Sequence, residues 1–428
     1  MKLPHEICGS FLLKKKIKNL LTTTFDIIII KRFISKNVLK GFGYMLGKIE
    51  LMAPCHFGME AVLKKEIFDL GYDVTKVTDG RVYFEGDSEA ICYANVFLRT
   101  AERVLINVGE FKAETFEDLF QGTKAIEWER FIPEDAKFNV VKAASVKSKL
   151  FSPTDIQKIM KKAMVDRLGA YYNRTHFDET GIEFGIRVMI NKDIVSVGID
   201  TTGTSLHKRG YRLLTAKAPI AENLAAAIIM LSPWREDRIL VDPFCGSGTF
   251  PIEAALIGAN IAPGINRRFS AMEWKHLIDP KMWADCKTDA RERIIVPKRP
   301  DIQGYDIDPE MVEIARENAR KAGVDKYIHF QVRDVKDLSH HKKYGFIITN
   351  PPYGERLMDK ESVSKVYIML GEKYKELDSW SMYMITSYPD AETMIGKKAD
   401  KNRKIYNGMM KTYLYQFMGP KPPKRQEG

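Results

Sequence analysis

The sequence RILVDPFCGSGTF, residues 238–250, predicts a buried strand that passes through a tight glycine turn into a helix. Gly246 and Gly248 make the turn, and their lack of side chains lets a ligand approach the backbone closely. No Gly-Lys-Ser/Thr follows, so the turn is not a Walker loop, and the third glycine of the dinucleotide fingerprint is missing. The turn alone is therefore compatible with a ligand site and with a simple reversal of the chain.

Strands and helices alternate on both sides of this turn from about residue 209, which predicts a parallel sheet. The expected strands are RILVDP, DIQGYD, YIHFQV, YGFIIT and SMYMITS. The expected helices are PIAENLAAAIIML, FPIEAALIGA, PEMVEIARENARKAG and ESVSKVYIMLGEKYKEL. The last segment, RKIYNGMMKTYLYQFM, contains Asn407-Gly408, a typical hairpin turn. We therefore predict a Rossmann-like α/β domain whose parallel sheet ends in an antiparallel hairpin.

Two further acidic residues follow the second and third expected strands. Asp306, in GYDID, stands where an acid accepts hydrogen bonds from both hydroxyls of a ribose. Asp308 precedes Pro309 and is expected to cap the next helix instead. Asp334 can accept a hydrogen bond from the amino group of an adenine. With the glycine turn, these residues predict a nucleoside site without a cation for phosphate, which points to S-adenosylmethionine as the cofactor.

The stretch TNPPYGER, residues 349–356, ends the fourth expected strand. A turn after a strand explains most Pro-Pro pairs. The functional alternative is methyl transfer to an exocyclic amine, whose nitrogen becomes positively charged as it attacks. Asn350 and the carbonyl of Pro351 can each accept one amine hydrogen, and Pro352 helps to hold that carbonyl outward. Tyr353 can stack on a base turned out of its helix, an interaction worth about 1–3 kcal/mol.

The composition of the whole chain limits the remaining choices. Its 428 residues predict two or three domains, and the net charge of +11 favours an anionic partner such as RNA or DNA. Five scattered cysteines without a CxxC pair indicate a reducing compartment and no zinc site. The apolar run FDIIII near the start is too short to span a bilayer. We therefore expect a cytoplasmic protein with neither a membrane partner nor a metal.

The first half of the chain predicts smaller α+β units. Residues 1–44 are lysine-rich, and we interpret them as an N-terminal extension; one hypothesis is that it is not native and that Met45 is the working start. Residues 45–102 predict strand, helix, strand and helix. The following stretch, to residue 205, contains a lysine-bearing strand, a helix capped by Ser152 and a hairpin at residues 191–193. The expected strand carries Lys142, Lys147 and Lys149.

The motifs DPFCGSGTFPIEAA, GYDID and NPPYGER together resemble the class I methyltransferases that act on exocyclic amines of nucleic acids. HKRGYR followed by APIAENLAAAI resembles the ribosomal RNA guanine-N2 methyltransferases that carry a THUMP domain. The resemblance implies a ferredoxin-like domain at 45–102, a THUMP-like RNA-binding domain at 103–205 and a methyltransferase domain at 206–428. The chain stops soon after the hairpin, so it resembles the single-activity members of the family and not the bifunctional ones.

The same resemblance implies a role for each site residue. The residues implied on the methionine side of the cofactor are Asp242, Phe244, Gly246, Gly248 and Thr249. Asp306 is implied at the ribose, Asp334 at the adenine, and residues 350–353 at the target base.

Two segments are candidates for contact with RNA. HKRGYR offers Lys208, Arg209 and Arg212 for phosphates and Tyr211 as an aromatic ring, although a charged linker between domains is the alternative. The insert at residues 259–299 is either a substrate flap or a structural elaboration.

We expect the enzyme to methylate N2 of a guanine in 23S (large-subunit) rRNA. The alternatives are guanine N2 in tRNA, adenine N6 in DNA, and a non-catalytic RNA-binding factor of ribosome assembly.

Overall fold

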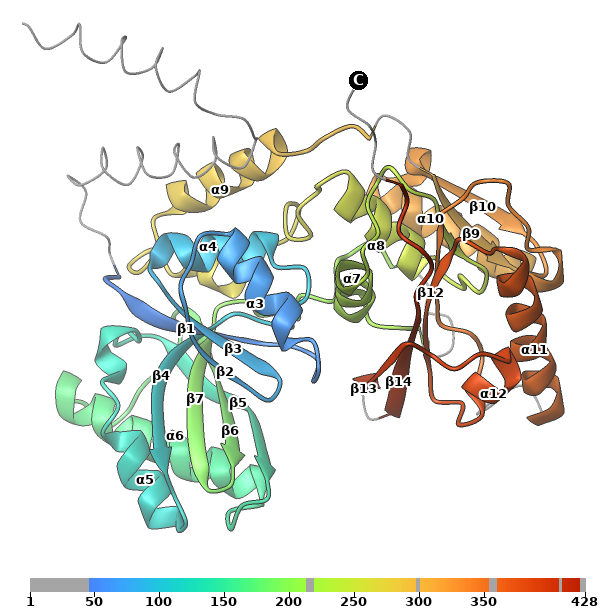
Figure 1. Ribbon diagram of the computed structural model, residues 1–428. Coiled ribbons are helices and arrows are strands. Elements are labelled where there is room, and N and C mark those ends of the chain that lie inside the picture. Colours follow the sequence, from blue (N-terminus) through green and yellow to red (C-terminus); the bar gives the residue numbers. More distant parts are fainter. Residues whose placement is uncertain (1–45, 213–218, 298–300, 354–359, 408–409, 424–428) are drawn as a thin grey trace, which may run out of the picture. The chain divides into compact units, whose positions relative to one another are not determined.

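A computed structural model describes residues 46–212, 219–297, 301–353, 360–407 and 410–423 (Figure 1). The expected extension at residues 1–44 lies outside the described residues, as does Gly408 of the expected hairpin turn. The described residues contain two seven-stranded sheets, one in each half of the chain. No helix among them is long and apolar enough to cross a membrane.

The first sheet is continuous through both expected N-terminal domains. Its strands, in spatial order, are β2 (Val74–Thr78), β3 (Arg81–Gly86), β1 (Ile49–Pro54), β4 (Leu105–Lys112), β7 (Ile194–Asp200), β6 (Glu183–Asn191) and β5 (Lys137–Val146). β4 makes the sheet continuous, because it pairs with β1 on one side and with β7 on the other. Its helices are α3 (Glu60–Asp69), α4 (Ser88–Phe97), α5 (Phe116–Lys124) and α6 (Pro153–Tyr172), with the short 3-10 turn η1 (Trp128–Arg130).

Local sequence signals account for several of these elements. The Ser152 side chain accepts a hydrogen bond from the backbone N–H of Asp155, and Pro153 opens α6, as predicted. The hairpin between β6 and β7 turns at Lys192 and Asp193, which both have positive φ. The prediction that one strand carries three lysines is wrong in part, because β5 ends at Val146 and leaves Lys147 and Lys149 in the following loop.

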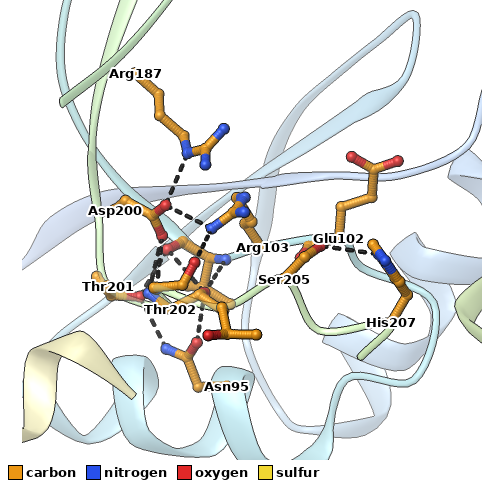
Figure 2. A network of polar contacts seen from close by, with 12 residues as sticks. Asn95, Glu102, Arg103, Arg187, Asp200, Thr201, Thr202, Ser205 and His207 are labelled. Carbon is orange, nitrogen blue, oxygen red and sulfur yellow. Dashed lines mark hydrogen bonds and ion pairs between the residues drawn. The ribbon is translucent and has the colours of Figure 1, made fainter. Parts of the chain in front are cut away.

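A polar network fixes the end of β7, where the chain leaves the first sheet (Figure 2). The carboxylate of Asp200 accepts hydrogen bonds from Arg103 and Arg187, each at 2.7 Å. The Asn95 side chain donates to the hydroxyl of Thr201 and accepts from that of Thr202. These contacts join α4, β6, β7 and Arg103, which lies just before β4, to the start of the segment that leads to residue 208.

The second sheet has the expected Rossmann-like form. Its strands, in spatial order, are β10 (Ile328–Val332), β9 (Ile302–Asp306), β8 (Leu240–Asp242), β11 (Phe346–Thr349), β12 (Ser381–Thr386), β14 (Met410–Phe417) and β13 (Lys401–Asn407). The first five are parallel, and β14 pairs antiparallel with both β12 and β13. The strand order reverses between β8 and β11, the position where open α/β sheets bind ligands.

Helices cover both faces of this sheet. They are α7 (Glu222–Leu231), α8 (Thr249–Gly258), α10 (Pro309–Ala322), α11 (Lys360–Glu376) and α12 (Ala391–Ile395), with the 3-10 turns η3 (Asp325–Tyr327) and η4 (Val335–Asp337). Leu240 and Ile348 pack in the cluster that contains α7, α8 and α10, whereas their neighbours Val241 and Ile347 pack in the cluster that contains α11 and α12. The central strands are therefore buried on both sides, which explains their continuous apolar sequences.

The insert before β9 belongs to the core of the first sheet. It contains η2 (Ser270–Glu273) and α9 (Pro280–Glu292), and α9 packs against α4. Trp274 is fully buried and stacks on Phe184 with ring centroids 4.5 Å apart. The Ser88 hydroxyl donates to the carbonyl of Leu277 at 2.8 Å. Of the two interpretations of the insert, the structure therefore favours the structural elaboration over the substrate flap.

Candidate active site

The candidate site lies at the carboxyl ends of four neighbouring parallel strands. Asp242 ends β8, Asp306 ends β9, Asp334 follows β10 and Asn350 follows β11. Because the pairings β10–β9, β9–β8 and β8–β11 are parallel, these ends share one edge of the sheet. The structure thus places four residues from separate sequence motifs along a single edge.

The two glycines of the turn have different surroundings. Both have positive φ, +49° at Gly246 and +84° at Gly248, which disfavours other residues. A Cβ added to Gly246 would meet no atom within 4 Å, so the backbone there is open to a ligand. A Cβ added to Gly248 would lie 3.0 Å from side-chain atoms of Ala315 and Phe330. Gly248 therefore allows close packing of α8 against α10 and β10.

Asp306 connects the glycine turn to the end of β9. One carboxylate oxygen accepts the backbone N–H of Gly246 at 2.9 Å, and the other accepts that of Asp308 at 3.0 Å. Each oxygen retains a second lone pair for a ribose hydroxyl. Burial raises the pKa of Asp306, and the two hydrogen bonds oppose that shift. Asp308 caps α10 by accepting the N–H of Glu310 at 2.8 Å, which confirms its predicted capping role, while the ribose role of Asp306 stays a prediction.

Asp334 lies beside the ribose candidate on the next strand. It caps η4 by accepting the backbone N–H of Lys336 at 3.0 Å, and the Lys336 ammonium lies 3.4 Å from its carboxylate. The adjacent Arg333 donates its backbone N–H to the carbonyl of Asp306 at 2.9 Å. These contacts give Asp334 a capping role, and its role at the adenine stays a prediction.

Asp242 is a buried acid that joins the glycine segment to the Asn-Pro-Pro-Tyr strand. It accepts hydrogen bonds from the hydroxyl of Thr349 at 2.6 Å and from the backbone N–H of Phe244 at 3.1 Å. Burial raises the pKa of Asp242 to about 7, although both hydrogen bonds favour its charged form. Since Thr349 directly precedes Asn350, Asp242 fixes the strand end that presents the amide.

The side-chain oxygen of Asn350 is buried and has no hydrogen-bond partner among the described residues. Pro351 is buried, and Pro352 and Tyr353 are partly exposed. A buried acceptor without a donor costs about 1–3 kcal/mol, so such atoms are uncommon in folded proteins. The Asn350 oxygen is thus available to a ligand that donates a hydrogen bond. The rest of the stretch, residues 354–356, lies outside the described residues.

Two side chains of the HKRGYR segment, those of Arg209 and Tyr211, are buried in the protein. The Arg209 side chain is 2% exposed and pairs at 3.4 Å with Glu253 of α8, which is fully buried. Arg209 also donates to the backbone carbonyls of Arg99 and Leu206. The hydroxyl of Tyr211, another buried residue, donates to Glu253 at 3.1 Å.

The expectation that Arg209 and Tyr211 contact RNA is therefore wrong, because both side chains are buried in the core and bind Glu253 there. Lys208 is exposed and remains a candidate for RNA contact. The signal that sequence reasoning missed was Glu253 itself. An acid in the apolar helix FPIEAALIGA requires a buried cation nearby.

Arg212 also contacts α8, one turn before Glu253. Its guanidinium donates to the hydroxyl of Thr249 at 3.0 Å, to the carbonyl of Ile220 at 3.1 Å and to the carboxylate of Glu222 at 3.1 Å. Thr249 is the first residue of α8, directly after the glycine turn. Arg212, which the sequence suggested for RNA phosphates, is thus largely buried against α7 and α8. It lies beside Thr249, which the family resemblance implies on the methionine side of the cofactor.

This group of residues fits S-adenosylmethionine. Gly246 leaves open space at the turn, and Asp306 offers carboxylate oxygens where a ribose is expected. Asp242 adds a second carboxyl group, which suits a cofactor that carries positive charge on its sulfonium and ammonium groups. In the part of the chain that the structure describes, no group of three or more His, Cys, Asp or Glu side chains could hold a metal ion.

Comparisons with known proteins agree with this fold and with S-adenosylmethionine as the cofactor. Residues 50–105 match the RlmL ferredoxin-like domain, residues 113–200 the THUMP domain, and residues 209–416 the RMKL-like methyltransferase domain. A relative from Bacillus subtilis (strain 168), named "Putative RNA methyltransferase YpsC", is 46% identical over 382 residues, which cover 89% of this chain and 98% of that protein.

Two solved structures are similarly close. The protein SMU.472, described as a putative methyltransferase complexed with SAH, is 47% identical with a TM-score of 0.82, over 88% of this chain and 99% of that one. A protein from Listeria monocytogenes, described as a predicted N6-adenine-specific DNA methylase, is 48% identical with a TM-score of 0.81, over 87% and 97% of the two chains. This chain therefore belongs to the family of S-adenosylmethionine-dependent methyltransferases in which an RlmL-type ferredoxin-like domain and a THUMP domain precede an RMKL-like methyltransferase domain.

Proposed function

We propose that the protein transfers the methyl group of S-adenosylmethionine to the exocyclic N2 of a guanine in RNA, and that its substrate is 23S (large-subunit) rRNA. The observation that carries this proposal is the buried Asn350 oxygen, to which no described residue donates a hydrogen bond. An exocyclic amine of a nucleobase brings two hydrogens to the site, and one of them satisfies this oxygen. The carbonyl of Pro351, which follows directly, accepts the other.

These two acceptors make the amine a nucleophile. In the free base, the nitrogen lone pair is conjugated into the ring, and it becomes available only when the nitrogen turns pyramidal. The cofactor supplies a methyl group on a positively charged sulfur. As the N–C bond forms and the C–S bond breaks, positive charge develops on the nitrogen, and the two oxygens stabilise that charge. The product nitrogen then loses a proton to solvent, so no strong base is required.

The neighbouring residues hold the base in place. Tyr353 stacks on the turned-out base, which offsets part of the few kcal/mol that extrusion from the stack costs. Thr349 and Asp242 anchor the strand end on which Asn350 sits. The roles of Asp306 at the ribose and Asp334 at the adenine, and of Phe244, Gly246, Gly248 and Thr249 at the methionine side, belong to the same proposal.

Exposed groups in the first half of the chain support an RNA substrate. Phe151 is 81% exposed and stands at the loop between β5 and α6. Lys142, Lys147 and Lys149 are exposed on the same strand and loop. Basic groups and an exposed ring on one strand and its following loop match what single-stranded nucleic acid binds: the cations bind phosphates and the ring stacks on bases. The THUMP match at residues 113–200 and the name of the Bacillus subtilis relative support the same substrate class.

The second candidate is methylation of adenine N6 in DNA. The description of the Listeria monocytogenes relative favours it, and adenine also presents an exocyclic amine to Asn350. The THUMP domain argues against it.

Analysis of the methylated nucleoside separates the candidates. Total RNA from a strain that lacks the gene is incubated with the protein and labelled cofactor, fractionated and digested to nucleosides. N2-methylguanosine in the 23S fraction is the expected product. N6-methyladenosine would overturn the guanine assignment, and label in tRNA would overturn the rRNA assignment. Absence of transfer by protein that still binds the cofactor product would favour a non-catalytic assembly factor.

A further inference from the structure

The guanidinium of Arg212 is held on two of its three nitrogens. Nε donates to Glu222, and Nη2 donates to the Thr249 hydroxyl and to the carbonyl of Ile220. The side chain is only 12% exposed. It is therefore fixed in orientation by α7, by α8 and by Ile220, which lies just before α7.

The third nitrogen, Nη1, is buried and has no hydrogen-bond partner among the described residues. Arginine keeps its charge in proteins, so the N–H groups of Nη1 cannot be removed by deprotonation. A buried donor on a charged group is more costly to leave unpaired than a neutral one. An anionic or strongly accepting partner, which the described residues do not provide, would satisfy this nitrogen.

The surroundings of Nη1 also favour an anion. Its neighbour Thr249 opens α8, whose first turn carries no acidic residue and whose N-cap, Gly248, has no side chain to cap the helix. The N-terminus of a helix carries partial positive charge and free backbone N–H groups. The charge of Arg212 is already paired with Glu222, so an added carboxylate completes the hydrogen bonding of the guanidinium without displacing that contact.

We propose that Arg212 binds the carboxylate of the methionine part of S-adenosylmethionine through Nη1. The cofactor has one carboxylate, which is its single anionic group, and the Gly246–Gly248 turn beside Thr249 is where its methionine part is expected. Arg212 thus recognises the amino-acid end of the cofactor, whereas Asp306 is proposed for the ribose. This inference rests on the cofactor and is independent of which base is methylated.

Binding of two ligands that differ only in the carboxylate tests the proposal. Isothermal titration compares S-adenosylhomocysteine with its decarboxylated analogue, in which hydrogen replaces the carboxylate. A charge-assisted hydrogen bond predicts that the full-length protein prefers S-adenosylhomocysteine by about 10- to 100-fold. In Arg212→Met, affinity for S-adenosylhomocysteine falls by the same factor, and the two ligands bind equally.

Arg238→Met is the matched control, because Arg238 is another partly buried arginine that donates to a backbone carbonyl, that of Tyr344 at 2.8 Å. We expect Arg238→Met to keep the wild-type preference for S-adenosylhomocysteine over the decarboxylated analogue. Equal loss of both ligands in Arg212→Met would show a structural role and overturn the proposal, as would a preserved preference. If Arg212→Met does not fold, Arg212→Lys is measured instead. A reduced preference of this variant for S-adenosylhomocysteine over the decarboxylated analogue supports the proposal, and an unreduced preference contradicts it. The proposal is also contradicted if the wild-type protein binds the two ligands equally.

Discussion

At the scale of single residues, Asp242 is the group whose protonation matters most to the site. It is buried, its pKa is raised to about 7, and it hydrogen-bonds the residue before Asn350. The resemblance to the methyltransferase family implied Asp242 on the methionine side of the cofactor. Its bond to Thr349 could not be predicted, because that contact depends on the pairing of β8 with β11, strands that are about a hundred residues apart in the chain.

The pH dependence of cofactor binding follows from this pKa. A positively charged ligand beside Asp242 favours its ionised form, so binding below about pH 7 releases a proton. We expect affinity for S-adenosylmethionine, which carries the sulfonium charge, to rise with pH between about 5 and 7, by at most about tenfold per pH unit, and then to level off. Asp306, whose pKa is also raised, broadens the rise. Asp242→Asn flattens most of the profile, measured by titration calorimetry; an unchanged profile would contradict the assignment.

The same shift affects stability in a defined direction. Because the folded pKa of Asp242 lies above its ordinary value of 3.8, the folded state binds this proton more tightly than the unfolded chain. Its contribution to stability is full below about pH 4 and is lost as the pH rises to about 7.

Single residues also show why part of the site could not be predicted. The hexapeptide HKRGYR has the same sequence whether its cations face phosphates or a buried acid. Whether a cation is exposed or buried distinguishes these two roles, and only the fold determines it. Lys208 is exposed, whereas Arg209 is buried and paired with Glu253.

At the scale of elements, the sequence predicted best what depends on neighbouring residues. Rules that involve only neighbouring residues predict the cap of α6 by Ser152, the turn at Lys192-Asp193 and the alternation of strands and helices from β9 to β12. The sequence did not predict the pairing of elements that are far apart in the chain. Nothing near β1 or β4 in the sequence indicates that they lie side by side, so the continuous first sheet was not predicted.

The two glycines of the turn give a matched pair of variants. Gly246→Ala and Gly248→Ala both force a side chain into positive φ, at about 1–2 kcal/mol. Only Gly248→Ala also meets Ala315 and Phe330 at 3.0 Å. We expect Gly248→Ala to lower the melting temperature further, and Gly246→Ala to weaken cofactor binding with the smaller loss of stability. Equal losses of stability would show that the crowding at Gly248 is relieved at no cost.

The contact of the HKRGYR segment with α8 is a buried ion pair. Removal of one partner leaves the other charge buried and unpaired, which typically costs about 3–5 kcal/mol. We therefore expect Arg209→Met to lower the free energy of unfolding by that amount in urea denaturation. Lys208→Met, one residue away and exposed, should change it by less than about 0.5 kcal/mol. A stability of Arg209→Met equal to that of Lys208→Met would place Arg209 on the surface.

At the scale of the whole described chain, residues from the methyltransferase half complete the core of the first sheet. Trp274, Leu277 and Trp283 come from the insert before β9 and lie in the cluster built on β1, β4 and β6. The sequence left the role of this insert open, because a Trp among charged residues is compatible with a flap or a core. The stacking of buried Trp274 on Phe184 assigns the insert to the core.

Trp274→Ala should therefore destabilise the protein as a core substitution does, by about 3–5 kcal/mol in urea denaturation. Arg268→Ala, whose side chain is 85% exposed in the same insert, is the control and should be close to neutral. If Trp274→Ala unfolds at the wild-type urea concentration, the insert does not belong to the core.

The central claim is that the side-chain oxygen of Asn350, which has no donor among the described residues, makes an exocyclic amine nucleophilic. The most direct test is the single-turnover rate of methyl transfer by Asn350→Ala, with RNA from the deletion strain and saturating cofactor, alongside its affinity for S-adenosylhomocysteine. Loss of one positioned acceptor predicts a rate lower by about 10²- to 10³-fold. The affinity should stay within about twofold, since Asn350 lies on the substrate side. A wild-type rate in Asn350→Ala would contradict the account.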